Sequence, residues 1–144
     1  MPAKTIRTFT PLAFVLLALA GGCGKTYSLN NSVEGTLTLD GTPVTNVVVQ
    51  FVPDDPKVQL PTSTGTTDDK GHFELTCQDG KPGAVVGKHN VVVLVGRTDT
   101  GAPASAVAVP DVYKVAAQTP RQIDVTADQH SYDVKLTRAA GPRK

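Results

Sequence analysis

Short stretches in which apolar and polar residues alternate, separated by turn residues, constrain the fold of this chain more than any other feature. In residues 33–39, Val, Gly and Leu alternate with Glu and Thr, so that one face is apolar and the other is polar. Asp40-Gly41 follows, and this dipeptide favours a hairpin turn because both residues tolerate positive φ. No segment has a convincing helical period. The pattern predicts an all-β sandwich.

Seven segments of the chain are predicted to be strands. Residues 90–95 carry valines on both faces and are expected in the interior of a sheet, whereas the polar residues 62–67 suit an edge. The last two segments are expected to pair as a hairpin that closes the sandwich. The predicted strands are 33–39, 47–52, 62–67, 72–76, 90–95, 122–126 and 131–137.

The core of this sandwich has to be built from small side chains. The chain has no Trp, and aromatic residues make up 5% of it, so Val, Leu and Ala must supply the buried contacts. Cys77 continues the apolar alternation of Phe73 and Leu75. We therefore expect Cys77 to be a buried thiol, because apolar surroundings suppress the reactive thiolate.

The N-terminus has the order of an export signal. Lys4 and Arg7 precede an apolar run over residues 9–20, which is too short to span a bilayer as a helix. Small residues then lead to Gly22 and Cys23, with the predicted cleavage between them. This junction resembles the bacterial lipobox, which implies that Cys23 is lipidated on its sulfur and, after cleavage, on its amine. An ordinary secretory signal with an incidental cysteine is the alternative.

The export signal defines the expected organisation of the chain. Residues 1–22 would be a lipoprotein signal peptide, 23–31 a lipidated tether, 32–138 the sandwich and 139–144 a basic flexible tail. Two or three acyl chains would make the anchoring persistent. The mature protein is therefore expected on a bacterial membrane, facing the periplasm or the cell exterior, with membrane lipid as a partner.

The charge balance argues against nucleic acid as a partner. The full chain has 14 Lys and Arg against 13 Asp and Glu, and removal of residues 1–22 takes away Lys4 and Arg7. The mature chain is then nearly neutral and has no basic stripe of the kind that phosphate backbones require.

Possible metal ligands were weighed against structural roles. His72 and Glu74 alternate on one strand, and His89 and His130 could approach a common end of the sandwich, but this spacing falls short of a zinc pattern. We interpret all four as solvated surface residues. The pairs Asp54-Asp55 and Asp68-Asp69 lack the alternating ligands of a calcium loop and are interpreted as turn-forming carboxylates.

Motifs of known catalytic chemistry are missing from the sequence. There is no Gly-x-Ser-x-Gly elbow, phosphate-binding loop or His-Glu-x-x-His helix. We therefore expect a protein that is not an enzyme and that uses no metal or other cofactor.

Three segments together resemble a known family of domains. They are VEGTLTLDGTPV at 33–44, TTDDKGHFEL at 66–75 and GKHNVVV at 87–93. These segments are similar to carboxypeptidase regulatory-like, transthyretin-like domains, and above all to small planctomycete-type lipoproteins that also carry a Val-Pro-x-x-Tyr segment, here ending at Tyr113. The resemblance covers about residues 32–138. It implies a seven-stranded antiparallel Greek-key sandwich and assigns no activity.

Two functions follow as the main hypotheses. The first is a lipid-anchored, non-catalytic sandwich with a structural or adhesion-type role at the cell envelope. The alternative is a binding module for carbohydrate, peptide or an envelope protein, which would use the Gly-, Ala- and Pro-rich loop 97–112 and Tyr113. Few aromatic rings are available for a sugar platform. A third hypothesis is an accessory domain of a peptidase or transporter.

Overall fold

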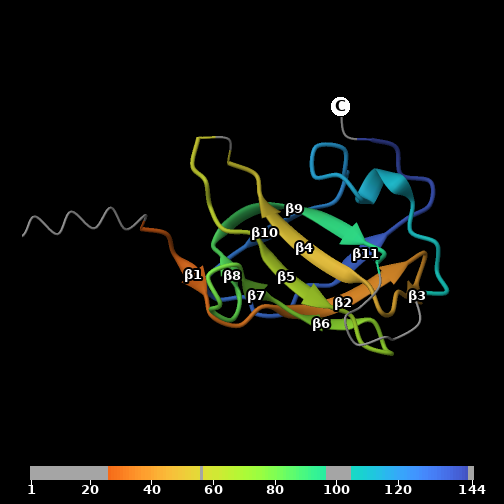
Figure 1. Cartoon of the computed structure of the whole chain (residues 1–144), viewed down its shortest axis with the longest axis horizontal. Coiled ribbons are helices and arrows are strands. Elements are labelled where there is room, and N and C mark those ends of the chain that lie inside the picture. The colour runs from red at the N-terminus through yellow and green to blue at the C-terminus, as the bar shows by residue number, and fades with distance from the viewer. Residues whose placement is uncertain (1–25, 56, 97–104, 143–144) are drawn as a thin grey trace, which may run out of the picture.

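Two β-sheets that face each other form the body of the protein (Figure 1). The computed structural model describes residues 26–55, 57–96 and 105–142. Over these ranges the chain is all-β with almost no helix, as the alternating pattern predicts. Within the described residues the elements are β1 (Leu29–Asn30), β2 (Glu34–Leu39), β3 (Thr42–Pro43), β4 (Val48–Pro53), β5 (Ser63–Thr66), β6 (His72–Glu74), β7 (Thr76–Cys77), β8 (Ala84–Val85), β9 (Gly87–Leu94), the 3-10 helix η1 (Asp111–Tyr113), β10 (Gln122–Val125) and β11 (Val134–Leu136).

The larger sheet has the strand order β10-β9-β4-β5-β7, and all its neighbouring strands are antiparallel. β9 lies between β10 and β4, which confirms the interior position predicted for residues 90–95. The edge position predicted for residues 62–67 is wrong in part. The two-residue strand β7 pairs with Ser63 and Thr64 and covers that half of β5.

The second sheet has the order β11-β2-β3, with β6 also paired to β2. The predicted strand 72–76 is divided between the two sheets, because β6 pairs with β2 whereas β7 pairs with β5. Leu75 lies at the crossing and is buried in the core. One alternating segment thus links the two layers of the sandwich.

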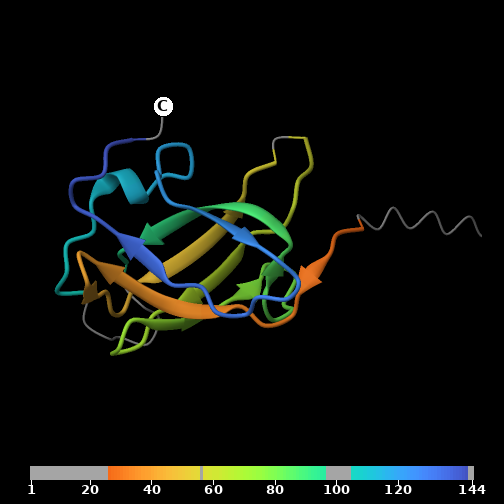
Figure 2. The ribbon, with the colours of Figure 1, turned by 180° about the vertical axis from the view of Figure 1, so that it is seen from behind.

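The predicted hairpin of the last two strands is wrong. β10 pairs with β9 in the larger sheet, and β11 pairs with β2 in the other sheet (Figure 2). The β11–β2 pairing is parallel, with Val134 opposite Leu37, so the sandwich is not entirely antiparallel. Alternation determines which side chains of a strand are buried, but it leaves the choice of neighbouring strand open.

Part of the predicted tether is bound to the domain. Leu29 and Asn30 form β1, which pairs with Val85 and Ala84 of β8. This correction has a local cause, because Asn30 is buried and makes hydrogen bonds that a free linker would lack. A two-residue strand has no period by which the sequence could reveal it.

Two glycines show why the predicted turns and close contacts form. Gly41 has a φ of +84° and follows Asp40 at +50°, as the predicted Asp-Gly turn requires. Gly35 lies in β2 where the backbone of Tyr132 approaches closely, and a Cβ atom on Gly35 would lie 1.9 Å from the Tyr132 carbonyl oxygen. The missing side chain of Gly35 therefore permits the Tyr132 segment to pack closely against β2.

Valine is the commonest residue of the core between the sheets. Phe51 from β4 and Phe73 from β6 meet there, with ring centroids 6.1 Å apart. The core also contains Leu37, Leu39 and Leu136 from β2 and β11, all almost completely buried. The predicted core of small aliphatic side chains is therefore confirmed.

Candidate functional site

The described residues begin close to the predicted lipidation site. Gly22 and Cys23 lie outside the described residues, and Thr26 is the first residue placed. Leu29 of β1 follows Cys23 by six residues, a separation of about 20 Å at most along an extended chain. Any attachment at Cys23 would therefore hold the β1 end of the sandwich near the attachment point.

β1 is fastened to the sandwich by the side chain of Asn30. Its amide nitrogen donates to the carbonyl oxygens of Thr126 at 2.8 Å and Gln129 at 2.6 Å. Its oxygen accepts from the backbone amide of Ser32 at 3.1 Å and lies 3.0 Å from Nδ1 of His130. One buried side chain thus ties the N-terminal strand to the segment that joins the two sheets.

Tyr27 lies just before β1 and is held in place by charged neighbours. Its hydroxyl donates to the Asp79 carboxylate, and Lys81 Nζ lies 3.1 Å from Asp79 and 5.7 Å from the centre of the Tyr27 ring. The hydrogen bond to the carboxylate raises the pKa of Tyr27 and lowers the pKa of Asp79. The two opposite charges neutralise each other beside the ring.

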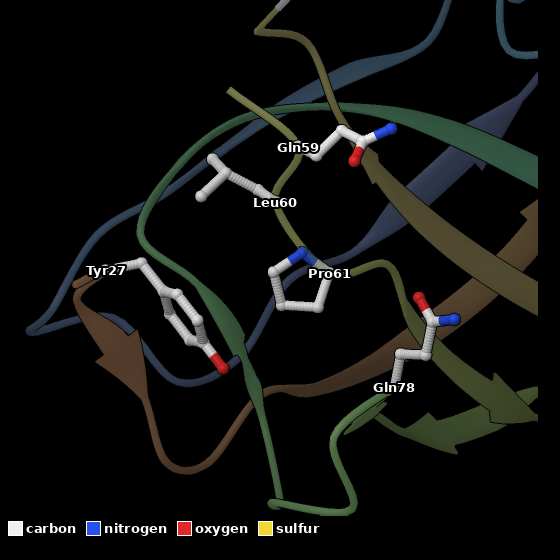
Figure 3. A pocket seen from close by; sticks show the side chains of 5 residues that line it. All are labelled: Tyr27, Gln59, Leu60, Pro61 and Gln78. Carbon is white, nitrogen blue, oxygen red and sulfur yellow. The ribbon is translucent and has the colours of Figure 1, made fainter. Parts of the chain in front are cut away.

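A polar groove opens next to Tyr27 (Figure 3). It consists of a hollow of about 520 Å³ and an adjoining hollow of about 380 Å³, and Gln78 contributes to both. Figure 3 shows Pro61 between the Tyr27 ring and Gln78, with Leu60 above the Tyr27 ring. We define the polar groove by Tyr27, Gln50, Gln59, Leu60, Pro61, Thr62, Thr64 and Gln78.

Sheet register explains how residues far apart in sequence reach the polar groove. Gln50 of β4 pairs with Thr64 of β5. The backbone amide of Gln78 donates to the carbonyl of Thr62 at 2.9 Å, which brings the residue after β7 beside the start of β5. The neighbours Val49, Ser63 and Cys77 are buried, so alternation directs Gln50, Thr64 and Gln78 away from the core.

The predicted binding loop 97–112 is only partly described. Residues 97–104 lie outside the described residues, and Val109 is buried in the core. Tyr113, proposed as a binding residue, is 2% exposed. Its hydroxyl donates to the Thr137 carbonyl at 3.0 Å and accepts from the Thr137 amide at 3.1 Å. This correction makes Tyr113 a structural anchor.

The interpretation of all three histidines as solvated surface residues is wrong for His89. His89 is 1% exposed, whereas His72 is half-buried and His130 is exposed. Its Nδ1 donates to the Gly87 carbonyl at 2.8 Å, and its ring lies 5.9 Å from that of Phe51. Alternation with Val91 places the His89 side chain on the core face, which lowers its pKa through desolvation.

The Asp pairs act mainly through backbone and side-chain hydrogen bonds. Asp68 accepts from the amides of Lys70 and His72, which lowers its pKa and confirms the predicted turn. Asp54 instead accepts from the side-chain amides of Asn90 at 2.9 Å and Gln122 at 3.0 Å. In the described part of the chain, no three His, Cys, Asp or Glu side chains gather as metal ligands would.

The groove residues were missed by sequence reasoning. Gln50, Thr64 and Gln78 occupy outward positions that the alternation does indicate, but Tyr27 and Gln59 come from segments without a period. Cys77, the predicted buried thiol, is 2% exposed, and this prediction is confirmed. Sequence position alone could not indicate that these outward residues share one hollow.

Comparisons with known proteins identify no relative. No family model, no curated protein and no solved structure matches this chain. Among the residues that the structure describes, no helix is both long and apolar enough to cross a membrane.

Proposed function

We propose that the protein is an exported lipoprotein, anchored through acylated Cys23, whose non-catalytic β-sandwich has a structural or adhesion-type role at the cell envelope. The observation that carries this proposal is the attachment of β1 to the sandwich only a few residues after Cys23. A short, fastened connection would transmit force from an anchor to a rigid domain, whereas a long free linker would not.

The direction of the strands indicates which end of the sandwich would face away from the membrane, namely the end far from β1. β9 begins at Gly87, next to the β1–β8 pair, and runs about 25 Å to Leu94. Figure 1 shows β2 and β9 both leading away from β1. The Asp40-Gly41 turn follows β2. In an anchored protein, this end would face away from the membrane.

We further propose a transthyretin-like Greek-key arrangement for the sandwich. Seven strands would be its main elements, and they overlap the seven segments of alternating sequence. These strands are β2, β4, β5, β6, β9, β10 and β11, with the parallel β11–β2 pair as a departure from a fully antiparallel pattern.

Metabolic labelling with a fatty acid tests the anchor. Labelling and recovery in the membrane fraction are expected for the unmodified protein and lost in Cys23→Ala. Cys77→Ala is the matched control and should stay labelled, because Cys77 is buried within the domain. Equal labelling of Cys23→Ala and the unmodified protein would refute the proposed anchor.

A further inference from the structure

The polar groove has the chemistry of a binding site for a neutral carbohydrate. Three carboxamide side chains, those of Gln50, Gln59 and Gln78, line it together with the hydroxyls of Thr62 and Thr64. Within the described residues, these five polar side chains make no hydrogen bonds to other protein groups, so their donors and acceptors are available to a ligand. An amide presents both a donor and an acceptor, and a hydroxyl can act as either.

The electrostatics of the groove select an uncharged ligand. None of its eight residues carries a formal charge at neutral pH. Asp79 and Lys81, which contact Tyr27, form an ion pair with each other. A charged ligand would lose hydration here without gaining an opposite charge. The adjacent donors and acceptors instead match the vicinal hydroxyls of a sugar, each of which both donates and accepts.

The apolar part of the groove suits the C–H face of a sugar ring. Tyr27, Leu60 and Pro61 line the larger hollow, and Figure 3 shows them on the side away from the Gln59 and Gln78 amides. Tyr27 supplies one aromatic surface, and its hydroxyl bond to Asp79 limits the movement of the ring. A site with an apolar surface and a few convergent polar groups is the usual form of a small-molecule site.

The shape of the groove favours a chain of sugars. The two hollows share Gln78, and their lining runs from Tyr27 and Gln59 in the larger hollow to Gln50 and Thr64 in the other. We propose that the polar groove binds a neutral oligosaccharide. Tyr27, Leu60 and Pro61 would pack against the sugar rings, and the glutamine amides and threonine hydroxyls would form hydrogen bonds with the hydroxyl groups of the sugars. This inference goes beyond the proposed anchoring function and does not depend on lipidation of Cys23.

Saturation-transfer NMR and titration calorimetry test this site in the intact protein, solubilised in detergent. The probes are the neutral tetrasaccharides cellotetraose, tetra-N-acetylchitotetraose and maltotetraose, with a hyaluronan tetrasaccharide as the charged comparison. We expect at least one neutral probe to bind and the charged probe to bind more weakly. Gln50→Ala and Gln78→Ala should each weaken that binding about threefold to tenfold, the effect of losing one neutral hydrogen bond.

The controls separate binding from folding and from anchoring. Gln118→Ala removes an exposed amide outside the groove and should leave affinity unchanged. Gln50 and Gln78 make no side-chain hydrogen bonds within the described residues, so both variants should keep the circular dichroism spectrum and unfolding midpoint of the unmodified protein.

Failure of all three neutral probes to bind, or undiminished binding by the Gln50→Ala/Gln78→Ala double variant, would overturn the proposal. Preference for the charged probe would also overturn it. Cys23→Ala should bind as tightly as the unmodified protein.

Discussion

Tyr113 and Thr137 are joined by two hydrogen bonds through a single hydroxyl group. The Tyr113 hydroxyl donates to the Thr137 carbonyl and accepts from the Thr137 amide, at 3.0 and 3.1 Å. Thr137 directly follows β11, while Tyr113 ends η1, so the pair connects the long segment after β9 to the second sheet. The Thr137 amide donates to this oxygen, and the Thr137 carbonyl accepts from it and also from the Ala140 amide at 3.4 Å.

Removal of this oxygen should destabilise the protein. Tyr113→Phe leaves the aromatic ring in the core, removes the acceptor of the Thr137 amide and one of the two donors to the Thr137 carbonyl, and should cost about 1–3 kcal/mol in the free energy of unfolding. Urea denaturation measures the change. Thr137→Ala is the matched control and should be nearly neutral, because both bonds go to the backbone and the side chain is exposed. Equal stability of Tyr113→Phe and the unmodified protein would contradict the anchoring role.

A methyl group at Gly35 should be poorly tolerated. The Cβ atom of Gly35→Ala would lie 1.9 Å from the Tyr132 carbonyl oxygen and 2.9 Å from the edge of the Phe73 ring. The backbone of β2 would have to move, and we expect a loss of about 1–3 kcal/mol or more, as for overpacked cores. Thermal and urea unfolding are the measurements. Gly96→Ala, with nothing within 4 Å of its added Cβ, should change stability by less than about 0.5 kcal/mol.

Loss of the Asn30 side chain should release β1. In Asn30→Ala, the hydrogen bonds to the carbonyls of Thr126 and Gln129 are lost, which costs about 1–3 kcal/mol for groups left without partners. Hydrogen exchange should accelerate at the Val86 amide, which donates to Ser28 beside β1. The exposed Asn31→Ala serves as control. Unchanged exchange at Val86 would show that β1 stays docked without Asn30.

Buried His89 should make stability depend on pH. Burial lowers its folded-state pKa below 6.5, while Asp124 and the Gly87 carbonyl oppose this shift. Between the unfolded and folded pKa values, the unfolded chain binds a proton that the folded protein does not. Stability is therefore greatest above pH 6.5 and falls as the pH drops through this interval, by at most about 1.4 kcal/mol per pH unit.

Urea denaturation between pH 5 and 8 measures this contribution. His89→Leu removes the titrating group, so the difference in unfolding free energy between the variant and the unmodified protein should itself vary with pH. The half-buried His72 offers the comparison, and His72→Leu should retain the His89-dependent slope. A pH-independent difference between His89→Leu and the unmodified protein would contradict the assignment.

Local features of the fold were predictable because they depend on neighbouring residues. Alternation in residues 33–39 correctly indicates that Leu37 and Leu39 are buried, and Asp40-Gly41 forms the predicted turn. The same rule was available for His89, which shares its parity with Val91, but the polarity of an imidazole suggested a surface position. Burial there depends on the Gly87 carbonyl, which provides a partner for Nδ1.

The candidate site was much less predictable than the core. Tyr27 and Gln59 come from segments without periodicity, and Gln50 and Gln78 were unremarkable outward residues until the register placed them around one hollow. Loop 97–112 and Tyr113 were the binding elements predicted from the sequence. Tyr113 does not line the groove, because its hydroxyl binds backbone groups inside the protein.

The sequence by itself determined that this protein is built of β-strands and which face of most strands is buried, since both follow from residue alternation and turn chemistry within a few positions. Only the tertiary structure decided that β11 lies parallel to β2, that β1 is docked beside β8, and that amides from three segments share the polar groove. These arrangements depend on pairing between segments far apart in the chain. The sequence of a strand specifies which of its faces is buried, but it does not determine which strand lies next to it.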